Sequence, residues 1–314
     1  MTASTSAVPD RGTTGTRPGT ETGFLGRFKT GLKLSKDSLA IVREHPTLLV
    51  FPALGAISAL AFWTVFLVPL WIGGLIGSGV EYVVLFVLYF LTTFAATFFT
   101  ASLVFAVNQV FHGEEPKLTE SMRAAWRRKG AIFVWSAVAA TVSVILKKLQ
   151  ESDNAVARLL SSVFAVGWTV LTFFVVPVIV FEDVTATSMF SRSAETFRDT
   201  WGESVGVGLG VTLIQFAVAI VGVVVAVAVA LAVGAVVPVA GLAVGVFLVA
   251  GVLVGTYLVG QTIWGITKTA LYVYAAEERI PEGFANFDFE TLDGRTAKRA
   301  TPGRVNAPKL HLDD

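Results

Sequence analysis

The sequence predicts an all-α integral membrane protein with about six transmembrane helices, arranged as three hairpins that each follow an amphipathic helix at the membrane surface. Composition is the first observation: 54% of the 314 residues are hydrophobic and 15% are charged, against about 45–50% and about 25% in soluble domains. The second is the run from Ser204 to Thr267, which contains no Asp, Glu, Lys, Arg or His. That run is far longer than the roughly 20 apolar residues needed to cross a bilayer.

Each predicted span is an apolar segment of about the length that crosses the hydrocarbon core. The uncharged run is divided at Pro238 and Gly241 into two spans, because a single helix of that length would exceed the bilayer. Strands are excluded because they would leave backbone groups unpaired in lipid. The six predicted spans cover residues about 48–71, 82–107, 131–146, 159–181, 205–236 and 239–266. The third is the shortest, and the orientation of every later span depends on its being a full crossing.

Lys and Arg are concentrated at one end of the predicted spans. About fourteen Lys and Arg residues lie on one side of the membrane: before the first span, after the sixth, or in the loops on that same side. About three, Lys147, Lys148 and Arg158, lie on the opposite side. Cytoplasmic loops carry this excess, so we expect a multi-pass protein of the cell membrane with both termini in the cytoplasm. The polar tails, residues 1–23 and 285–314, are expected to be largely disordered, which leaves residues 24–284 as the membrane domain.

A threefold internal repeat accompanies the spans. Three charged amphipathic stretches each lead into a pair of spans: Phe24–Glu44, Leu118–Lys129 and Ser191–Thr200. Apolar residues at helical spacing with Lys and Arg between them are typical of a helix that lies in the headgroup plane. The repeat therefore favours three copies of a surface helix followed by a transmembrane hairpin.

A basic and aromatic cluster precedes the third span. Trp126 is followed by Arg127, Arg128 and Lys129. Near the cytoplasmic leaflet each such charge attracts anionic lipid by about 1 kcal/mol, which makes the cluster a candidate headgroup site. The alternative is that these positive charges only fix the orientation of the span, which explains the same residues equally well.

Two glutamines lie within the last two predicted spans, Gln215 and Gln261. They indicate either a polar path through the bundle or hydrogen bonds between helices. Glycines in the last predicted span recur four residues apart, at Gly241 and Gly245 and again at Gly251 and Gly255. Small residues at this spacing let helix backbones approach closely, so all four are predicted to be packing positions.

The remaining residue types exclude several kinds of chemistry. The chain has no cysteine, which excludes disulfides and thiolate metal sites. Its three histidines, His45, His112 and His311, are scattered outside the predicted spans, so no serine–histidine–acid set is proposed in the membrane. A net charge of +1 gives no basic excess for nucleic acid. We therefore expect no catalytic residues, no metal, no cofactor and no nucleic-acid partner.

Two segments carry a resemblance to known proteins. Leu32–Leu60 and Lys268–Phe284 resemble the two ends of an uncharacterised family of six-span membrane proteins of archaea and bacteria, over residues 24–284. The arrangement of its repeats is also similar to that of the membrane domain attached to some glycerophosphodiester phosphodiesterases. The catalytic domain of those enzymes has no counterpart in this sequence. The first resemblance implies the six-span fold, and it supplies no activity.

These observations favour a non-enzymatic protein that binds lipid, organises the membrane or supports a partner complex. The expected partners are membrane lipid and either another membrane protein or a second copy of the chain. The alternative is a permease or channel for a small neutral or apolar solute, favoured by the glycine- and proline-rich spans with Gln215 and Gln261.

Overall fold

The computed structural model describes residues 24–74, 79–185, 187–201, 207–277 and 279–284. The two tails predicted to be disordered lie outside these residues. Within them every regular element is helical, as predicted. In chain order the elements are α1 (Phe24–Glu44), η1 (Pro46–Leu49), α2 (Val50–Ile72), α3 (Val80–Val110), α4 (Leu118–Arg127), α5 (Lys129–Gln150), α6 (Ala155–Leu171), α7 (Val175–Phe181), α8 (Ser188–Trp201), α9 (Val207–Gly234) and α10 (Pro238–Glu277).

Six helical segments of the described chain are long and apolar enough to cross a membrane, which confirms the predicted all-α fold with six membrane-capable helices. They are Pro46–Ile72, Val80–Val110, Lys129–Gln150, Ala155–Phe181, Gln215–Gly234 and Val239–Glu277. The third comprises α5, whose 22 residues correspond to about 33 Å of helix. That length is sufficient for a full crossing of a core about 30 Å thick.

Two segments differ from the predicted spans in their course. The fourth is divided into α6 and α7, and Pro177 lies near the start of α7, where a missing backbone N–H costs little. The N–H of Phe174 at the division donates to the Ser193 hydroxyl at 3.1 Å. The last helix, α10, runs 40 residues to Glu277, well beyond the predicted end at 266. No proline or glycine interrupts its final turns.

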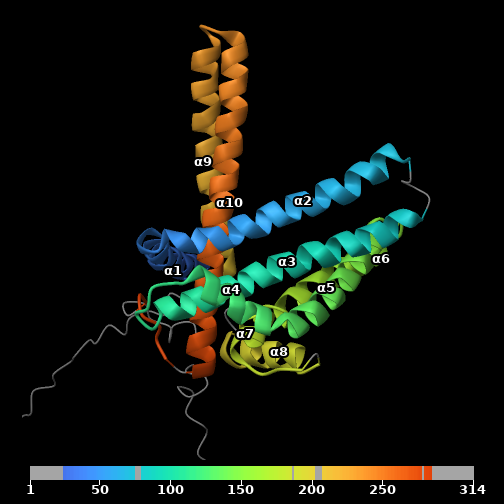
Figure 1. The fold of residues 1–314 in the computed structure, drawn as a ribbon, viewed down its shortest axis with the longest axis vertical. Helices are drawn as coiled ribbons and strands as arrows, with labels where there is room; N and C mark the ends of the chain where they lie inside the picture. Colours follow the sequence, from blue (N-terminus) through green and yellow to red (C-terminus); the bar gives the residue numbers. More distant parts are fainter. Residues whose placement is uncertain (1–23, 75–78, 186, 202–206, 278, 285–314) are drawn as a thin grey trace, which may run out of the picture.

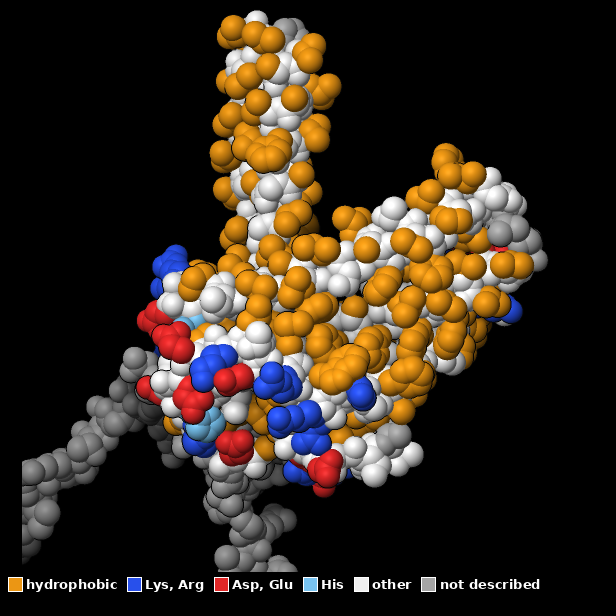
Figure 2. Space-filling view, viewed as in Figure 1, with side chains coloured by type: hydrophobic (Ala, Val, Ile, Leu, Met, Phe, Trp, Pro, Cys, Tyr) orange, Lys and Arg blue, Asp and Glu red, His pale blue; other side chains and the backbone are white. Residues whose placement is uncertain are grey.

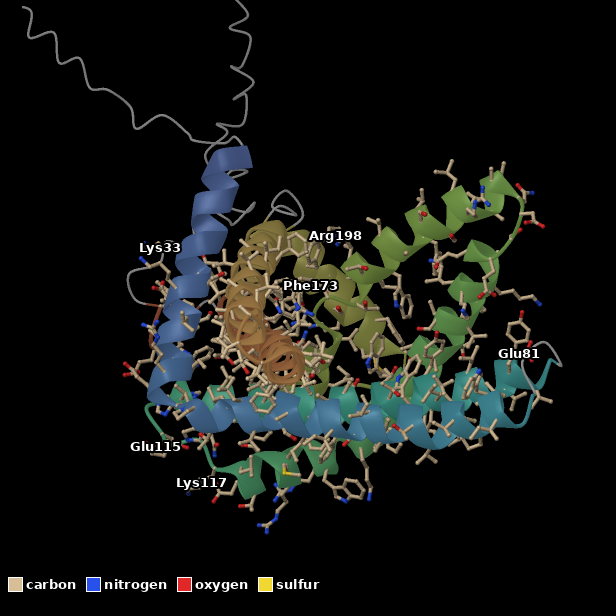
Figure 3. All side chains as sticks on the ribbon, turned by 90° about the horizontal axis from the view of Figure 1, so that it is seen from above. Lys33, Glu81, Glu115, Lys117, Phe173 and Arg198 are labelled. Carbon is tan, nitrogen blue, oxygen red and sulfur yellow. The ribbon has the colours of Figure 1, made fainter. Side chains whose placement is uncertain are left out.

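The apolar helices diverge from a common base. In Figure 1 the α9–α10 hairpin stands upright, whereas α2, α3, α5 and α6 run together away from it. The short helices α4, α7 and α8 and the lower part of α10 lie at the base. Charged side chains gather there, and the projecting helices are covered with apolar side chains (Figure 2). Seen from above, Glu81 lies at the far tip of α3, away from Glu115 and Lys117 at the base (Figure 3).

Helix α1 packs against both helices of the upright hairpin. Its buried Ser38 hydroxyl shares a hydrogen bond of 3.1 Å with the hydroxyl of Thr267 on α10. Leu34, Ile41 and Val42 on the same helix are buried in the core of the base. The first charged stretch of the sequence is therefore held by the last transmembrane helix, not only by the hairpin that follows it.

The packing of α9 against α10 depends on glycines at a few positions along the two helices. A Cβ atom added to Gly241 would lie 2.5 Å from the backbone nitrogen of Gly234 and 2.8 Å from the carbonyl oxygen of Ala230. One added to Gly245 would lie 2.8 Å from the Ala230 methyl. Added to Gly251 or Gly255, it would meet nothing within 4 Å. Close approach therefore occurs at the first pair of the four predicted packing glycines and not at the second.

We predict that Gly241→Ala and Gly251→Ala differ sharply although both glycines are in α10. The methyl at position 241 forces the two backbones apart, and overpacking of this kind costs about 1–3 kcal/mol. At position 251 the methyl has free space, so stability stays unchanged or rises by up to about 1 kcal/mol from helix propensity. Unfolding in mixed micelles by SDS titration, followed by circular dichroism, measures both. Equal losses would show that the hairpin does not depend on contact at Gly241.

Candidate functional site

Helix α4 forms the basic edge of the base and is strongly amphipathic. Ser121 and Ala125, one turn apart, are buried, and Leu118 and Met122 pack against the core. Arg123 and Arg127, also one turn apart, are exposed. Residues three and four apart share a face of a helix, so the spacing alone gives α4 an apolar face toward α3 and a basic edge.

A pocket of about 420 Å³ lies between α3 and α4, and we call it the α3–α4 pocket. It is lined by Phe105, Asn108, Gln109, Glu120, Ser121, Arg123, Ala124 and Arg127. The Gln109 side-chain oxygen accepts hydrogen bonds from the Lys117 N–H at 3.0 Å and the Ser121 hydroxyl at 3.3 Å. These bonds hold the start of α4 against α3 and fix the floor of the pocket.

The two arginines of the α3–α4 pocket retain their charge for a ligand. Neither Arg123 nor Arg127 forms an ion pair with a described residue. The one acid in the lining, Glu120, is 3.2 Å from the Lys117 ammonium and is neutralised there. Guanidinium groups form paired, charge-assisted hydrogen bonds with phosphate and carboxylate oxygens. The pocket can therefore bind an anionic group of modest size.

The predicted basic cluster is divided by the fold into three environments. Arg127 lines the α3–α4 pocket. Trp126 is 53% exposed, packs edge-on against Phe98, and has the Lys129 ammonium 4.9 Å from its ring centroid. Arg128 instead binds the Asp183 carboxylate at 2.9 Å. The structure thus leaves Trp126, Arg127 and Lys129 exposed, whereas Arg128 is held in a surface ion pair with Asp183.

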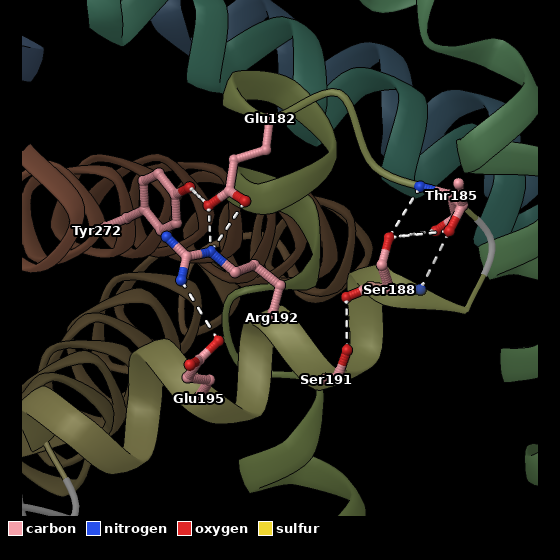
Figure 4. A network of polar contacts seen from close by, with 7 residues as sticks. All are labelled: Glu182, Thr185, Ser188, Ser191, Arg192, Glu195 and Tyr272. Carbon is pink, nitrogen blue, oxygen red and sulfur yellow. Dashed lines mark hydrogen bonds and ion pairs between the residues drawn. The ribbon is translucent and has the colours of Figure 1, made fainter.

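A carboxylate joins three elements beside this surface (Figure 4). Both oxygens of Glu182, at the end of α7, accept from the Arg192 Nε at 2.9 Å. The Tyr272 hydroxyl on α10 donates to the same carboxylate at 2.5 Å, and Arg192 also reaches Glu195 at 3.4 Å. The hydrogen bond to Glu182 raises the pKa of Arg192 above its usual value. Glu182 therefore ties the consecutive helices α7 and α8 to α10, 90 positions further along the chain.

The two glutamines of the predicted polar path do not share a cavity. The Gln215 amide donates to the Thr256 carbonyl oxygen of α10 at 3.3 Å and lies directly over Gly260. Gln261 lines a separate cavity among α2, α3, α5 and α10. In this position Gln215 acts as a contact between α9 and α10, the second of the two roles the sequence allowed.

Sequence reasoning missed Lys268. From the sequence, Lys268 is one of the positive charges expected directly after the last span. The structure continues α10 to Glu277, so Lys268 is a half-buried residue inside the helix. The signal was present in the sequence, since Leu271, Tyr272 and Val273 after the lysine are as apolar as the span before it.

Comparison with known proteins shows one similarity. The DUF6159 family, which is described as a family of unknown function, matches residues 79–283. The matched range contains nearly all of the segment Lys268–Phe284 that carries the sequence resemblance, and it leaves out Leu32–Leu60. No curated protein and no solved structure shows significant similarity to the chain.

We predict that Tyr272→Phe lowers stability and that Tyr257→Phe, on the same helix, does not. The first change removes a hydrogen bond to a charged group and should cost about 1–2 kcal/mol. The Tyr257 hydroxyl forms no hydrogen bond with a described residue, so its loss should be nearly neutral. Thermal unfolding in detergent, followed by tryptophan fluorescence, compares the two variants. A neutral Tyr272→Phe would contradict a structural role for the Glu182 contact.

Proposed function

Because the chain belongs to the DUF6159 family, whose function is unknown, we propose its role from the geometry: a non-enzymatic membrane protein that binds anionic phospholipid through the α3–α4 pocket. The observation that carries this proposal is the pair Arg123 and Arg127, charged and unpaired among the described residues, above a polar floor. A phosphate between them would receive hydrogen bonds from both guanidinium groups.

The surroundings of the pocket fit a lipid better than a free anion. Trp126, which directly precedes Arg127 on α4, is exposed and close to Lys129. Tryptophan side chains prefer the level of the lipid headgroups. Phe133, at the start of α5, is 55% exposed and would lie against the acyl chains. The same arrangement suits a protein that organises lipid or supports a partner complex at the membrane surface.

The second candidate is a permease or channel for a small neutral or apolar solute. Its support is the cavity that contains Gln261, because threonine hydroxyls from α3 line it within the apolar helices. Gln215 does not contribute to that cavity, since its amide is bound to Thr256. Uptake of small solutes into proteoliposomes, measured by light scattering, distinguishes this candidate from lipid binding alone.

We further propose that the charged base faces the cytoplasm, with both termini on that side, in the cell membrane. The support is the concentration of Lys and Arg at the base (Figure 2). Helix α5 then carries the chain across, so that Lys147, Lys148 and Arg158 lie outside.

We predict that reporters inserted between α5 and α6, at Asp153, behave as extracytoplasmic. Alkaline phosphatase should be active there and a green fluorescent reporter dark. The same reporters fused after Asp314 should give the opposite result. A cytoplasmic signal at Asp153 would mean that α5 does not cross, and it would reverse the orientation of all later spans.

We predict that the double variant Arg123→Gln/Arg127→Gln, purified in detergent, binds phosphatidylglycerol about thirtyfold more weakly than the unaltered protein. Each charge near an anionic surface contributes about 1 kcal/mol, and about 1.4 kcal/mol corresponds to tenfold. Retention of phosphatidylglycerol on the purified protein, counted by native mass spectrometry, measures the effect.

The matched control is Lys148→Gln/Arg158→Gln, which removes the same charge at the opposite end of the spans. It should retain phosphatidylglycerol as the unaltered protein does. Equal retention by both double variants would remove the α3–α4 pocket as the lipid site. Displacement of the lipid by inorganic phosphate alone would show that the pocket recognises the anion without its chains.

A further inference from the structure

A second cavity lies where the hairpins diverge, and we call it the α10 cavity. Its volume is about 440 Å³, within the range of about 300–1,000 Å³ usual for ligand sites. Residues from α2, α3, α5, α7 and α10 line it, and none of them lines the α3–α4 pocket. Tyr257, in its lining, is 46% exposed. Because this side chain reaches the surface, the cavity is open at the face of α10 that carries Tyr257.

Lys268 provides a charge in this cavity that no described residue neutralises. Its ammonium lies 4.8 Å from the ring centroid of Phe173 and 5.2 Å from that of Trp264. Phe173 occupies the middle of the molecule beside the upright hairpin (Figure 3). Lys268 forms no ion pair and donates no hydrogen bond to a described residue. Aromatic faces offset part of the cost of burying a cation, and its three N–H groups stay without acceptors.

The depth of Lys268 distinguishes it from a charge that marks the end of a span. It precedes Tyr272 by four residues, which is about 6 Å along the helix. Tyr272 binds Glu182 at the base, so Lys268 lies one turn further toward the apolar part of α10. A lysine at such a position is expensive, and ionisable residues of this kind usually mark a functional site.

Hydroxyl groups of α3 face the same cavity. Thr92, Thr93, Thr97 and Thr100 all contribute to its lining. The Thr97 hydroxyl accepts a hydrogen bond from the Trp135 ring N–H at 3.1 Å. The Thr92 hydroxyl is buried and has no hydrogen-bond partner in the structure.

Apart from Thr172, Tyr257 and Gln261, the rest of the lining is apolar, and it is small where α2 contributes. On the α2 side the cavity meets Gly55 and Ala59, and a Cβ on Gly55 would only touch Phe99, at 3.7 Å. A hydrophilic anion would neutralise Lys268 but leave this wall in contact with water. A neutral solute would leave the ammonium unpaired. One cation at one end of an apolar cavity that opens to lipid instead suits a molecule with an acid group and a hydrocarbon chain.

We infer that the α10 cavity binds an anionic amphiphile, with its acid group at the Lys268 ammonium and its chain between α2 and α10. The acid group accepts the N–H donors that the described residues leave unpaired, and the chain covers Gly55 and Ala59. The source is either a free fatty acid or a phospholipid of the bilayer, since both present an acid oxygen beside a hydrocarbon chain. This site is distinct from the α3–α4 pocket and does not depend on the proposed function.

Binding of radiolabelled oleate to the full chain in detergent tests the inference. Lys268→Met keeps the volume of the side chain and removes its charge, and it should weaken binding about tenfold or more, as expected for loss of a charge-assisted hydrogen bond. Lys268→Arg should stay within about threefold. Lys148→Met, at the opposite end of the spans, should change nothing. Equal binding by the Lys268→Met variant would overturn the assignment.

Two further measurements keep the result independent of folding and of the other site. Gly55→Leu fills the cavity without altering Lys268 and should also weaken oleate binding, while thermal unfolding confirms that each variant is folded.

Oleyl alcohol should compete about tenfold less well than oleate, and equal competition would show that charge is not recognised. Phosphatidylglycerol that competes better than oleate identifies a bilayer lipid as the ligand, and the reverse order identifies the free acid. Loss of oleate binding in Arg123→Gln/Arg127→Gln alone would assign the signal to the α3–α4 pocket.

Discussion

The Glu182 carboxylate is the contact on which the arrangement of the helices depends. It accepts hydrogen bonds from Arg192 on α8 and from Tyr272 on α10, so it joins the end of the fourth span to the helix that follows it and to the last helix. Above the base the upright hairpin stands clear of α2 and α3 (Figure 1). Contacts at the base therefore decide where α9 and α10 stand, and with them where the α10 cavity opens.

Most of the fold could be predicted because hydropathy reports directly on the solvent around each segment. The six spans and the all-helical character of the described residues follow from it. The end of α10 did not, since the rule ends a span at its first charge, whereas the Lys268 ammonium is stabilised by two aromatic rings. The Glu182–Tyr272 contact could not be predicted either, because it joins residues 90 positions apart and no local sequence pattern marks such a pair.

The four glycines of α10 show why spacing alone predicts packing incompletely. Gly241 and Gly251 belong to pairs with the same four-residue spacing, yet only Gly241 meets the backbone of α9. Spacing places two residues on one face of a helix but does not say which face the partner helix covers at that level. The close contact of Gly222 with Val252, where an added Cβ would lie 2.6 Å from a valine methyl, comes from outside any such pair.

The distribution of acids at the base decides which cations remain for ligands. The adjacent residues Glu182 and Asp183 bind Arg192 and Arg128 respectively, and Glu120 binds Lys117. Arg123, Arg127 and Lys268 are left without acids among the described residues, and each lines a cavity. An ion pair costs the protein little where water reaches it, but an unpaired cation in an apolar cavity is expensive. The presence of Lys268 in that position is therefore better explained by a ligand that neutralises it than by the fold alone.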